Sequence, residues 1–353
     1  MNIHSGKITR RTLVAGVGGA VAAGGLAVAT GGPAAAGQGH GRLRVLVATN
    51  EPWGTYHVKP LLAEASRRGY RLTQLVPDLS GIKPDDPVPV ATPDTAPPAD
   101  LLVVTGAGDW PADCAARFRR LPLAASSLAY LNPTEAPRAR ELRRRLRVVT
   151  SSSPAEGRAF AAYLGLRRDC DIRVVGSPQT DGLPARVPQP GTVLVLTSVT
   201  FPDQTGGAAP GTQLLLSAAE RLHAAGKRIL VGLHPRENRA LWERYEISAV
   251  PSVQASATAE VAIGIPGTVF PLVVAVGTPV VGCVDPALTV PDYLLDVCST
   301  TITAADQAVT AVDQAHLPDR DTLADAVGPI GGSAARLLKT WQRAATVHSG
   351  RGW

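Results

Sequence analysis

This sequence of 353 residues has few aromatic residues and lacks the common motifs of metal sites and of catalytic nucleophiles. Aromatics make up 4% of the chain, so aliphatic side chains must supply most of the hydrophobic core. The P-loop, the G-x-S-x-G elbow, the H-E-x-x-H motif and paired-aspartate metal signals are absent, so no metal or cofactor is implied. Beyond residue 36, no apolar run approaches the roughly 20 residues of a membrane-spanning helix.

Excess charge is also small, which argues against a dedicated nucleic-acid binder. The formal net charge is +6, and Lys7, Arg10 and Arg11 contribute three of those charges within a segment that has no acid. The remainder is therefore close to neutral for its size, and no zinc-finger, RRM or helix-turn-helix spacing is present.

The chain has four cysteines, Cys114, Cys170, Cys283 and Cys298. None has the C-x-x-C spacing of a zinc or redox site. An even number in an exported protein permits two disulfides, Cys114–Cys170 and Cys283–Cys298, and the alternative is four free thiols.

Export itself is predicted by residues 1–36. Thr9–Val14 contains paired arginines, residues 12–30 are uncharged and apolar, and Ala34–Ala36 offers a cleavage site. This order is typical of a signal peptide of the twin-arginine type. We expect an exported protein that uses the twin-arginine machinery, with an uncleaved anchor as the alternative.

Beyond a short linker at 37–42, two stretches alternate short apolar segments with helical ones. The first has expected strands at 43–49, 71–76, 101–105, 123–131, 147–150 and 172–175, and helices at 58–68, 113–120, 135–146 and 154–164. The second has expected strands at 192–197, 228–233, 261–265 and 279–284, and helices at 212–225, 239–243, 269–276, 304–314 and 333–347. Such alternation predicts parallel sheets covered on both faces.

A segment rich in glycine and proline, 182–191, separates the two stretches. The predicted fold is therefore α/β, with Rossmann-like domains at 43–181 and 192–347 whose parallel sheets face each other across a cleft. Ligands of such folds bind beyond the carboxyl ends of the strands.

Three predicted strand ends carry residues suited to that role. After the first strand, Asn50, Glu51 and Gly54 are expected to contact substrate. His57 would begin the next helix, where the helix dipole favours a neutral imidazole that can act as a base. The alternative is a histidine that caps or packs at the helix start.

The other two strand ends lie in the second domain. His234 and Arg236 can donate hydrogen bonds to phosphate oxygens, unless Arg236 pairs with Glu237 in a surface turn. The turn at Pro266, Gly267 and Thr268 precedes a helix, whose free amides could bind an anion.

A basic helix is also predicted. Arg140, Arg143, Arg144 and Arg147 have a spacing that places them on one helical face. This face could contact an anionic surface, although a solvated helix face is the simpler explanation.

Four regions, in a consistent order, resemble CDP-glycerol glycerophosphotransferases and related enzymes of the GT-B superfamily. Val175–Asp181 looks like their G-x-P-x-x-D segment at the domain junction, and Ile265–Val281 resembles their D-Y-S-S segment with its later K-P-V-I. Leu196–Phe201 followed by Leu233–Arg236 is similar to their T-F strand end and K-x-H-P-R run. Trp53–Leu62 looks like the G-H-x-x-P-L-L start of GT-B glycosyltransferases.

This resemblance implies a GT-B-like transferase whose second domain holds a nucleotide-linked donor. It implies that His57 is the base, that His234 and Arg236 contact the donor phosphates, and that Thr268 replaces a phosphate-binding serine. The chain departs from the pattern at Ile265 and Gly267, and Leu272–Val274 lacks the usual acidic residue. These losses are typical of a degenerate or repurposed site.

Three functions therefore remain open. The first is an exported transferase that acts on a nucleotide-diphosphate-linked sugar or polyol phosphate. The second is an exported, non-catalytic protein that binds a phosphorylated glycan or nucleotide. The third, an epimerase or hydrolase on the same scaffold, needs carboxylates in the cleft, for which Glu51 and Asp181 are the candidates.

Overall fold

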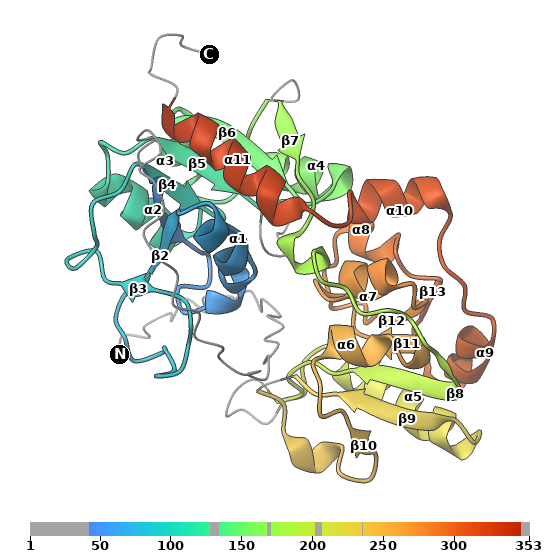
Figure 1. Ribbon diagram of the computed structural model, residues 1–353. Helices are drawn as coiled ribbons and strands as arrows, with labels where there is room; N and C mark the ends of the chain where they lie inside the picture. The colour runs from blue at the N-terminus through green and yellow to red at the C-terminus, as the bar shows by residue number, and fades with distance from the viewer. Residues whose placement is uncertain (1–41, 128–133, 168–170, 202–206, 235, 347–353) are drawn as a thin grey trace, which may run out of the picture.

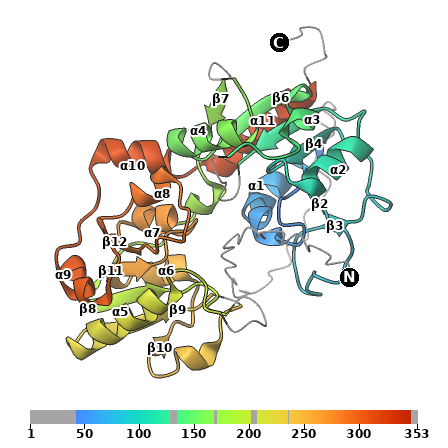
Figure 2. The ribbon, with the colours of Figure 1, turned by 180° about the vertical axis from the view of Figure 1, so that it is seen from behind.

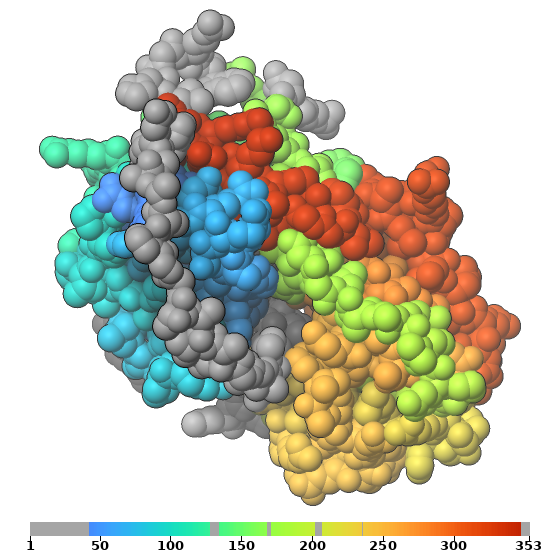
Figure 3. Space-filling model, in the orientation of Figure 1, coloured from blue at the N-terminus to red at the C-terminus, as the bar shows by residue number. Residues whose placement is uncertain are grey.

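The protein folds into two α/β lobes that lie side by side (Figure 1, Figure 3). The computed structural model describes residues 42–127, 134–167, 171–201, 207–234 and 236–346. The predicted leader at 1–36 and Cys170 lie outside the described residues. Within the described residues, no helix is long and apolar enough to cross a membrane.

The first lobe is built on a parallel sheet of seven strands in the order β3-β2-β1-β4-β5-β6-β7. Its strands are β1 (Arg44–Ala48), β2 (Arg71–Leu75), β3 (Val90–Ala91), β4 (Leu101–Val104), β5 (Leu123–Ser126), β6 (Leu146–Ser151) and β7 (Ile172–Val174). The order reverses between β1 and β4, so the loops after these two strands diverge and leave room for a ligand.

Helices cover both faces of this sheet because alternate strand residues point to opposite faces. On one face, Val45 and Val103 pack against α1 (Leu62–Arg67) and α11 (Ser333–Thr346). On the other, Leu46 and Leu102 pack against α2 (Asp109–Arg117), α3 (Ala139–Arg143) and α4 (Pro154–Tyr163). Figure 1 has α1 and α11 in front, and Figure 2 has α2, α3 and α4 in front.

The second lobe repeats the design with six parallel strands in the order β10-β9-β8-β11-β12-β13. They are β8 (Gln189–Leu196), β9 (Arg228–Gly232), β10 (Glu246–Ile247), β11 (Ala259–Gly264), β12 (Val280–Cys283) and β13 (Thr300–Ile302). Here the strand order reverses between β8 and β11. The predicted fold class, two facing Rossmann-like domains with parallel sheets, is confirmed.

Helices again cover both faces of the second sheet. One face packs against α5 (Thr212–Ala224) and α9 (Ala308–Asp313), and the other against α6 (Ser252–Ser256), α7 (Phe270–Val276) and α10 (Arg320–Val327). The short helix α8 (Asp292–Leu295) packs instead against α4 of the first lobe. Five 3-10 helices complete the fold within the described residues: η1 (Thr55–His57), η2 (Lys59–Leu61), η3 (Pro178–Thr180), η4 (Arg239–Leu241) and η5 (Ala305–Gln307).

The chain crosses between the lobes twice, which corrects the predicted domain boundaries. Strand β8 begins at Gln189, inside the expected linker 182–191, so the first crossing ends before the end of that linker. The second crossing follows α10, and α11 then packs on the first sheet, where Trp341 is fully buried. The last helix therefore belongs to the N-terminal lobe, and the prediction of one domain over 192–347 is wrong at its end.

Candidate functional site

The loop after β1 gathers three polar side chains that the sequence pattern singles out. The Tyr56 hydroxyl donates a hydrogen bond to Oε2 of Glu51 at 2.5 Å, and the Tyr56 and His57 rings lie 4.0 Å apart between centroids. His57 is buried in η1, the turn that leads towards α1. Burial, with the negative charge of Glu51, raises the pKa of the Tyr56 phenol, so this hydroxyl keeps its proton at neutral pH.

Gln74, which the motifs of the sequence do not include, fixes the shape of this loop. Its side-chain amide is fully buried and donates to the carbonyl oxygen of Pro52 at 2.8 Å and to Oγ1 of Thr49 at 3.3 Å. Thr49 in turn donates to the carbonyl oxygen of Glu51. The sequence does contain a signal for this role, because Gln74 is a polar residue within strand β2. A buried polar side chain needs a hydrogen-bond partner nearby.

Asn50 and Gly54, which were expected to contact substrate, support the loop from within it. The Asn50 side chain accepts from the Gly108 amide and donates to the Tyr163 hydroxyl, each at 3.4 Å, and it packs against Gly106. The Gly54 amide donates to the Glu51 carbonyl at 2.8 Å in a tight turn. The structure thus gives both residues local structural contacts.

In the second lobe, His234 lies at the carboxyl end of β9 and is buried. Its backbone amide donates to Oγ1 of Thr197 at 2.7 Å. Its Nδ1 accepts from the Arg236 amide at 3.2 Å, so the proton of the neutral ring is on Nε2. The histidine is thereby oriented as a hydrogen-bond donor.

Arg236 is exposed beside it, and the expected alternative of a surface pair with Glu237 is not seen within the described residues. The buried Glu237 carboxylate instead accepts from the Thr200 amide at 2.9 Å, the Thr200 hydroxyl at 2.7 Å and the Asn238 amide at 2.6 Å. Glu237 therefore secures the loop after β8, and Arg236 is exposed.

The turn after β11 fits the expectation only in part. Helix α7 begins at Phe270, whose amide donates to the Gly267 carbonyl at 3.0 Å, and Pro271 has no amide proton. Pro266 packs against Gly282 of β12. The first turn of α7 thus offers few free amides to an anion, and Thr268 remains as its polar contributor.

A pocket between the lobes brings residues from both sides together. Tyr56 and His57 line it from the first lobe, and Thr268 and Val269 line it from the second. Val269 also lines a neighbouring pocket that contains His234. The positive charge of Arg236 partly offsets the rise in the pKa of Tyr56, which places this guanidinium within electrostatic reach of the first lobe.

Glu156 is a pocket residue that the sequence motifs do not reveal. It is buried at the start of α4, and its Oε2 accepts from the Ser152 amide at 2.7 Å while its own amide donates to Ser153 Oγ at 3.1 Å. Burial raises the pKa of its carboxyl, and hydrogen bonds from Ser127 and Ser152 partly oppose the rise. The S-P-A-E sequence predicts a helix start, but it does not predict that Glu156 lines the same pocket as His57.

Asp181, by contrast, is occupied elsewhere. Its two carboxylate oxygens accept from the backbone amides of Ser333 and Ala334 at 2.7 and 2.8 Å, at the start of α11. This carboxylate therefore caps a helix, and both of its oxygens accept backbone amides in that role.

The basic stripe is also different from the prediction. Helix α3 ends at Arg143, and Arg147 lies on β6, where it donates to the Ala344 carbonyl at 3.0 Å. Arg143 donates to the Gly165 carbonyl at 2.8 Å. The four arginines Arg140, Arg143, Arg144 and Arg147 therefore do not share one helical face, and that expectation is wrong.

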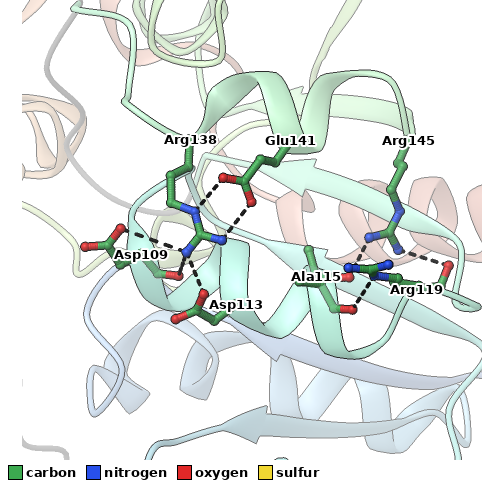
Figure 4. A network of polar contacts seen from close by, with 8 residues as sticks. Asp109, Asp113, Ala115, Arg119, Arg138, Glu141 and Arg145 are labelled. Atoms are coloured by element: carbon green, nitrogen blue, oxygen red, sulfur yellow. Dashed lines mark hydrogen bonds and ion pairs between the residues drawn. The ribbon is translucent and has the colours of Figure 1, made fainter.

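Two other arginines of this segment fasten α2 to α3 (Figure 4). Arg138 forms two hydrogen bonds of 2.7 Å with the Glu141 carboxylate and also contacts Asp113 at 2.5 Å. Arg145 donates to the carbonyl oxygens of Ala115 and Arg119. The positive charges of Arg138 and Arg145 are thus engaged in contacts within the first lobe.

The three cysteines within the described residues are free thiols. Cys283 and Cys298 lie close together, and burial raises the pKa of each thiol to about 12. The structure therefore has two protonated thiols in place of the predicted Cys283–Cys298 disulfide. The expected partner of Cys114, Cys170, is outside the described residues.

Comparison with known proteins identifies solved structures that have a similar fold. No protein-family model and no curated protein match the chain. A glycosyltransferase from Rickettsia africae ESF-5 is similar in structure, with a TM-score of 0.53, 9% identity, and coverage of 88% of this chain and 100% of that one. UDP-GlcNAc 2-epimerase from Methanocaldococcus jannaschii matches with a TM-score of 0.54, 11% identity, and coverage of 86% and 99%.

A variant of the wall teichoic acid polymerase TagF is similar at a TM-score of 0.56 and 9% identity, over 88% of this chain and 90% of that chain. Identities this low show the fold alone. The chain has the two-lobed GT-B fold that these glycosyltransferase and epimerase structures share.

Proposed function

We propose that this protein is an exported GT-B-type transferase that acts on a nucleotide-diphosphate-linked sugar or polyol phosphate. The observation that carries the proposal is the arrangement across the lobes. A buried imidazole, His57, faces the pocket from the first lobe, and cationic and hydrogen-bond-donating groups, Arg236 and His234, lie at the strand ends of the second. Export rests on the leader sequence.

The chemistry follows from these positions. With a sugar donor, the acceptor hydroxyl oxygen attacks the sugar carbon that bears the diphosphate, and the carbon–oxygen bond breaks to release the nucleoside diphosphate. With a polyol donor, it attacks the phosphorus that bears the polyol, and the bond from that phosphorus to the bridging oxygen breaks to release the nucleoside monophosphate. His57 takes the proton of the attacking hydroxyl, which requires a neutral imidazole. Arg236 and the Nε2–H of His234 stabilise the negative charge that develops on the departing nucleoside phosphate, and Thr268 adds a hydroxyl donor.

Donor binding and turnover can be tested separately on the purified protein. Melting is measured with CDP-, UDP- and GDP-linked sugars and polyols, and free nucleotide is then assayed over time. We expect one nucleotide class to raise the melting temperature, and His234→Ala to abolish the rise. His57→Gln should keep the rise but lower nucleotide release about 10²–10⁴-fold, the usual contribution of general base catalysis.

His316→Ala serves as the control, because His316 is an exposed histidine bonded to Ser299 on the surface of the second lobe. Stabilisation without release in the wild type, with an acceptor supplied, would favour the alternative of a non-catalytic binding protein. If no nucleotide changes the melting temperature, the donor site is wrongly assigned.

A further inference from the structure

Trp53 stands out because it is a large aromatic residue left in solvent. Its side chain is 41% exposed, whereas Trp242 and Trp341 are almost completely buried. It lies in the loop after β1, between Glu51 and the Tyr56–His57 pair. Exposed tryptophans at a functional edge are typical of binding contacts, since the indole offers a broad apolar face that binding can remove from water.

The indole ring is held in one position. Its Nε1–H donates to the carbonyl oxygen of Asp78 at 3.1 Å. Gly81 lies directly against the ring, because a Cβ atom at that position would be 2.4 Å from Cγ and Cδ1 of Trp53. A ring fixed in this way loses little conformational freedom when a ligand stacks on it.

The charges around Trp53 select the class of ligand. The adjoining loop contains Asp78, Asp85 and Asp86 against one cation, Lys83. Hydrogen bonds from Ser80 lower the pKa of the Asp78 carboxyl, so it is ionised at neutral pH. Asp86 already accepts from the Thr55 hydroxyl and the Val88 amide, so it contributes only charge. Together the three carboxylates repel phosphate-rich chains, and Asp78 and Asp85 can accept hydrogen bonds from ligand hydroxyl groups.

Taken with the proposed function, on which this step rests, we infer that Trp53 binds the acceptor, and that the acceptor is a neutral saccharide. The apolar C–H face of one sugar ring stacks on the open face of the indole, and its hydroxyls reach the aspartates of the adjoining loop. The phosphates of the reaction are thereby confined to the donor side, at Arg236 and His234. The loop beside Trp53 and the strand ends of the second lobe differ in charge because they bind chemically different partners.

The test is affinity electrophoresis of the purified full-length protein in native gels that contain dextran, pullulan, a mixed-linkage β-glucan, mannan or arabinogalactan. We expect at least one neutral polysaccharide to retard the wild type. Trp53→Ala should weaken that retardation about tenfold, and Trp53→Phe should weaken it less because an aromatic face remains. Phe201→Ala is the control, since Phe201 is an aromatic residue of the second lobe with a similar exposure of 42%.

Failure of this inference is distinguishable from failure of the proposed function. Trp53→Ala should keep the donor-induced rise in melting temperature, because the donor site is on the second lobe. No retardation by any neutral polysaccharide, equal losses in the Trp53 and Phe201 variants, or retardation only by a phosphate-containing polymer such as teichoic acid would overturn it. Saccharide binding without any nucleotide effect would instead remove the transferase proposal.

Discussion

The side chain of Glu156 combines a structural and an electrostatic role. Its carboxylate closes the first turn of α4 by accepting from the Ser152 amide, which satisfies a backbone donor that the helix cannot pair. Glu156 lines the same pocket as His57, and there it supplies the buried carboxyl that an epimerase or hydrolase would need. Burial raises the pKa of this carboxyl, so keeping the group buried costs stability as the pH rises.

The sign of that effect gives a prediction for Glu156→Gln. Above the ordinary pKa of 4.5, the unfolded chain releases this proton while the folded protein retains it, so wild-type stability falls until the raised folded pKa is reached. Glutamine does not titrate and can still accept from the Ser152 amide. The stability of the variant relative to the wild type should therefore rise with pH, by about 1.4 kcal/mol for each pH unit that separates the unfolded and folded pKa values.

Urea unfolding at intervals from pH 4 to pH 8 measures this difference. Glu141→Gln is the comparison, because Arg138 lowers the pKa of the exposed Glu141 carboxyl, and any effect there has the opposite sign. A constant stability difference between Glu156→Gln and the wild type across that range would contradict the prediction.

At the scale of elements, the sequence predicted helices best where a segment of helical apolar spacing begins at a recognisable capping residue. The helix expected at 154–164 is α4, and the one at 212–225 is α5. Ser153 and Pro154 mark the first of these by capping and by a missing amide proton. His57 and Thr268, which the sequence pattern singled out separately at two strand ends, line one pocket in the structure.

The sequence pattern did not predict the shortest strands and helices. The strands β10 and β13 and the helices α6 and α8 have two to five residues each, too few for a hydrophobic period to show. Helix α10 has eight residues but a polar sequence, and it is stabilised by packing on α4 and α7 and by the Arg158–Asp325 pair at 2.5 Å. Tertiary contacts that a local pattern does not encode decide such elements.

Helix α11 allows the capping role of Asp181 to be tested. Asp181→Ala removes both hydrogen bonds to the amides of Ser333 and Ala334, and a favourable charge at the helix start. We expect a loss of about 1 kcal/mol in the free energy of unfolding, the usual value for an N-cap. Asp181→Asn keeps one acceptor oxygen and should lose less.

Denaturant unfolding, followed with hydrogen exchange of the α11 amides, reports this loss. Asp319→Ala provides a matched cap on a different helix, since Asp319 accepts from the Asp321 and Thr322 amides at the start of α10. If Asp181→Ala leaves exchange in α11 unchanged, the cap does not stabilise that helix.

On the scale of the whole molecule, the second crossing of the chain ties the lobes together. After α10, Gly328 adopts a φ of 75° and lies so near the Ser152 carbonyl that a Cβ atom would be 2.2 Å from it. Only glycine fits there. Sequence periodicity predicted that α11 is a helix, but it did not predict the lobe on which α11 packs. An amphipathic helix can pack on any apolar surface, so the tertiary structure decides which sheet it covers.

The buried tryptophans make the assignment of α11 testable. Trp341 is fully buried on the first sheet, and its indole N–H donates to Ser126 Oγ at 2.9 Å, whereas Trp242 is buried in the second lobe. Each change to alanine should cost about 3–5 kcal/mol, but in different lobes. Hydrogen exchange should quicken in β1 and β4 for Trp341→Ala, and in β8 and β9 for Trp242→Ala. Faster exchange in β8 and β9 with β1 and β4 unchanged in Trp341→Ala would return α11 to the C-terminal lobe, because a helix that packs on one sheet stabilises that sheet first.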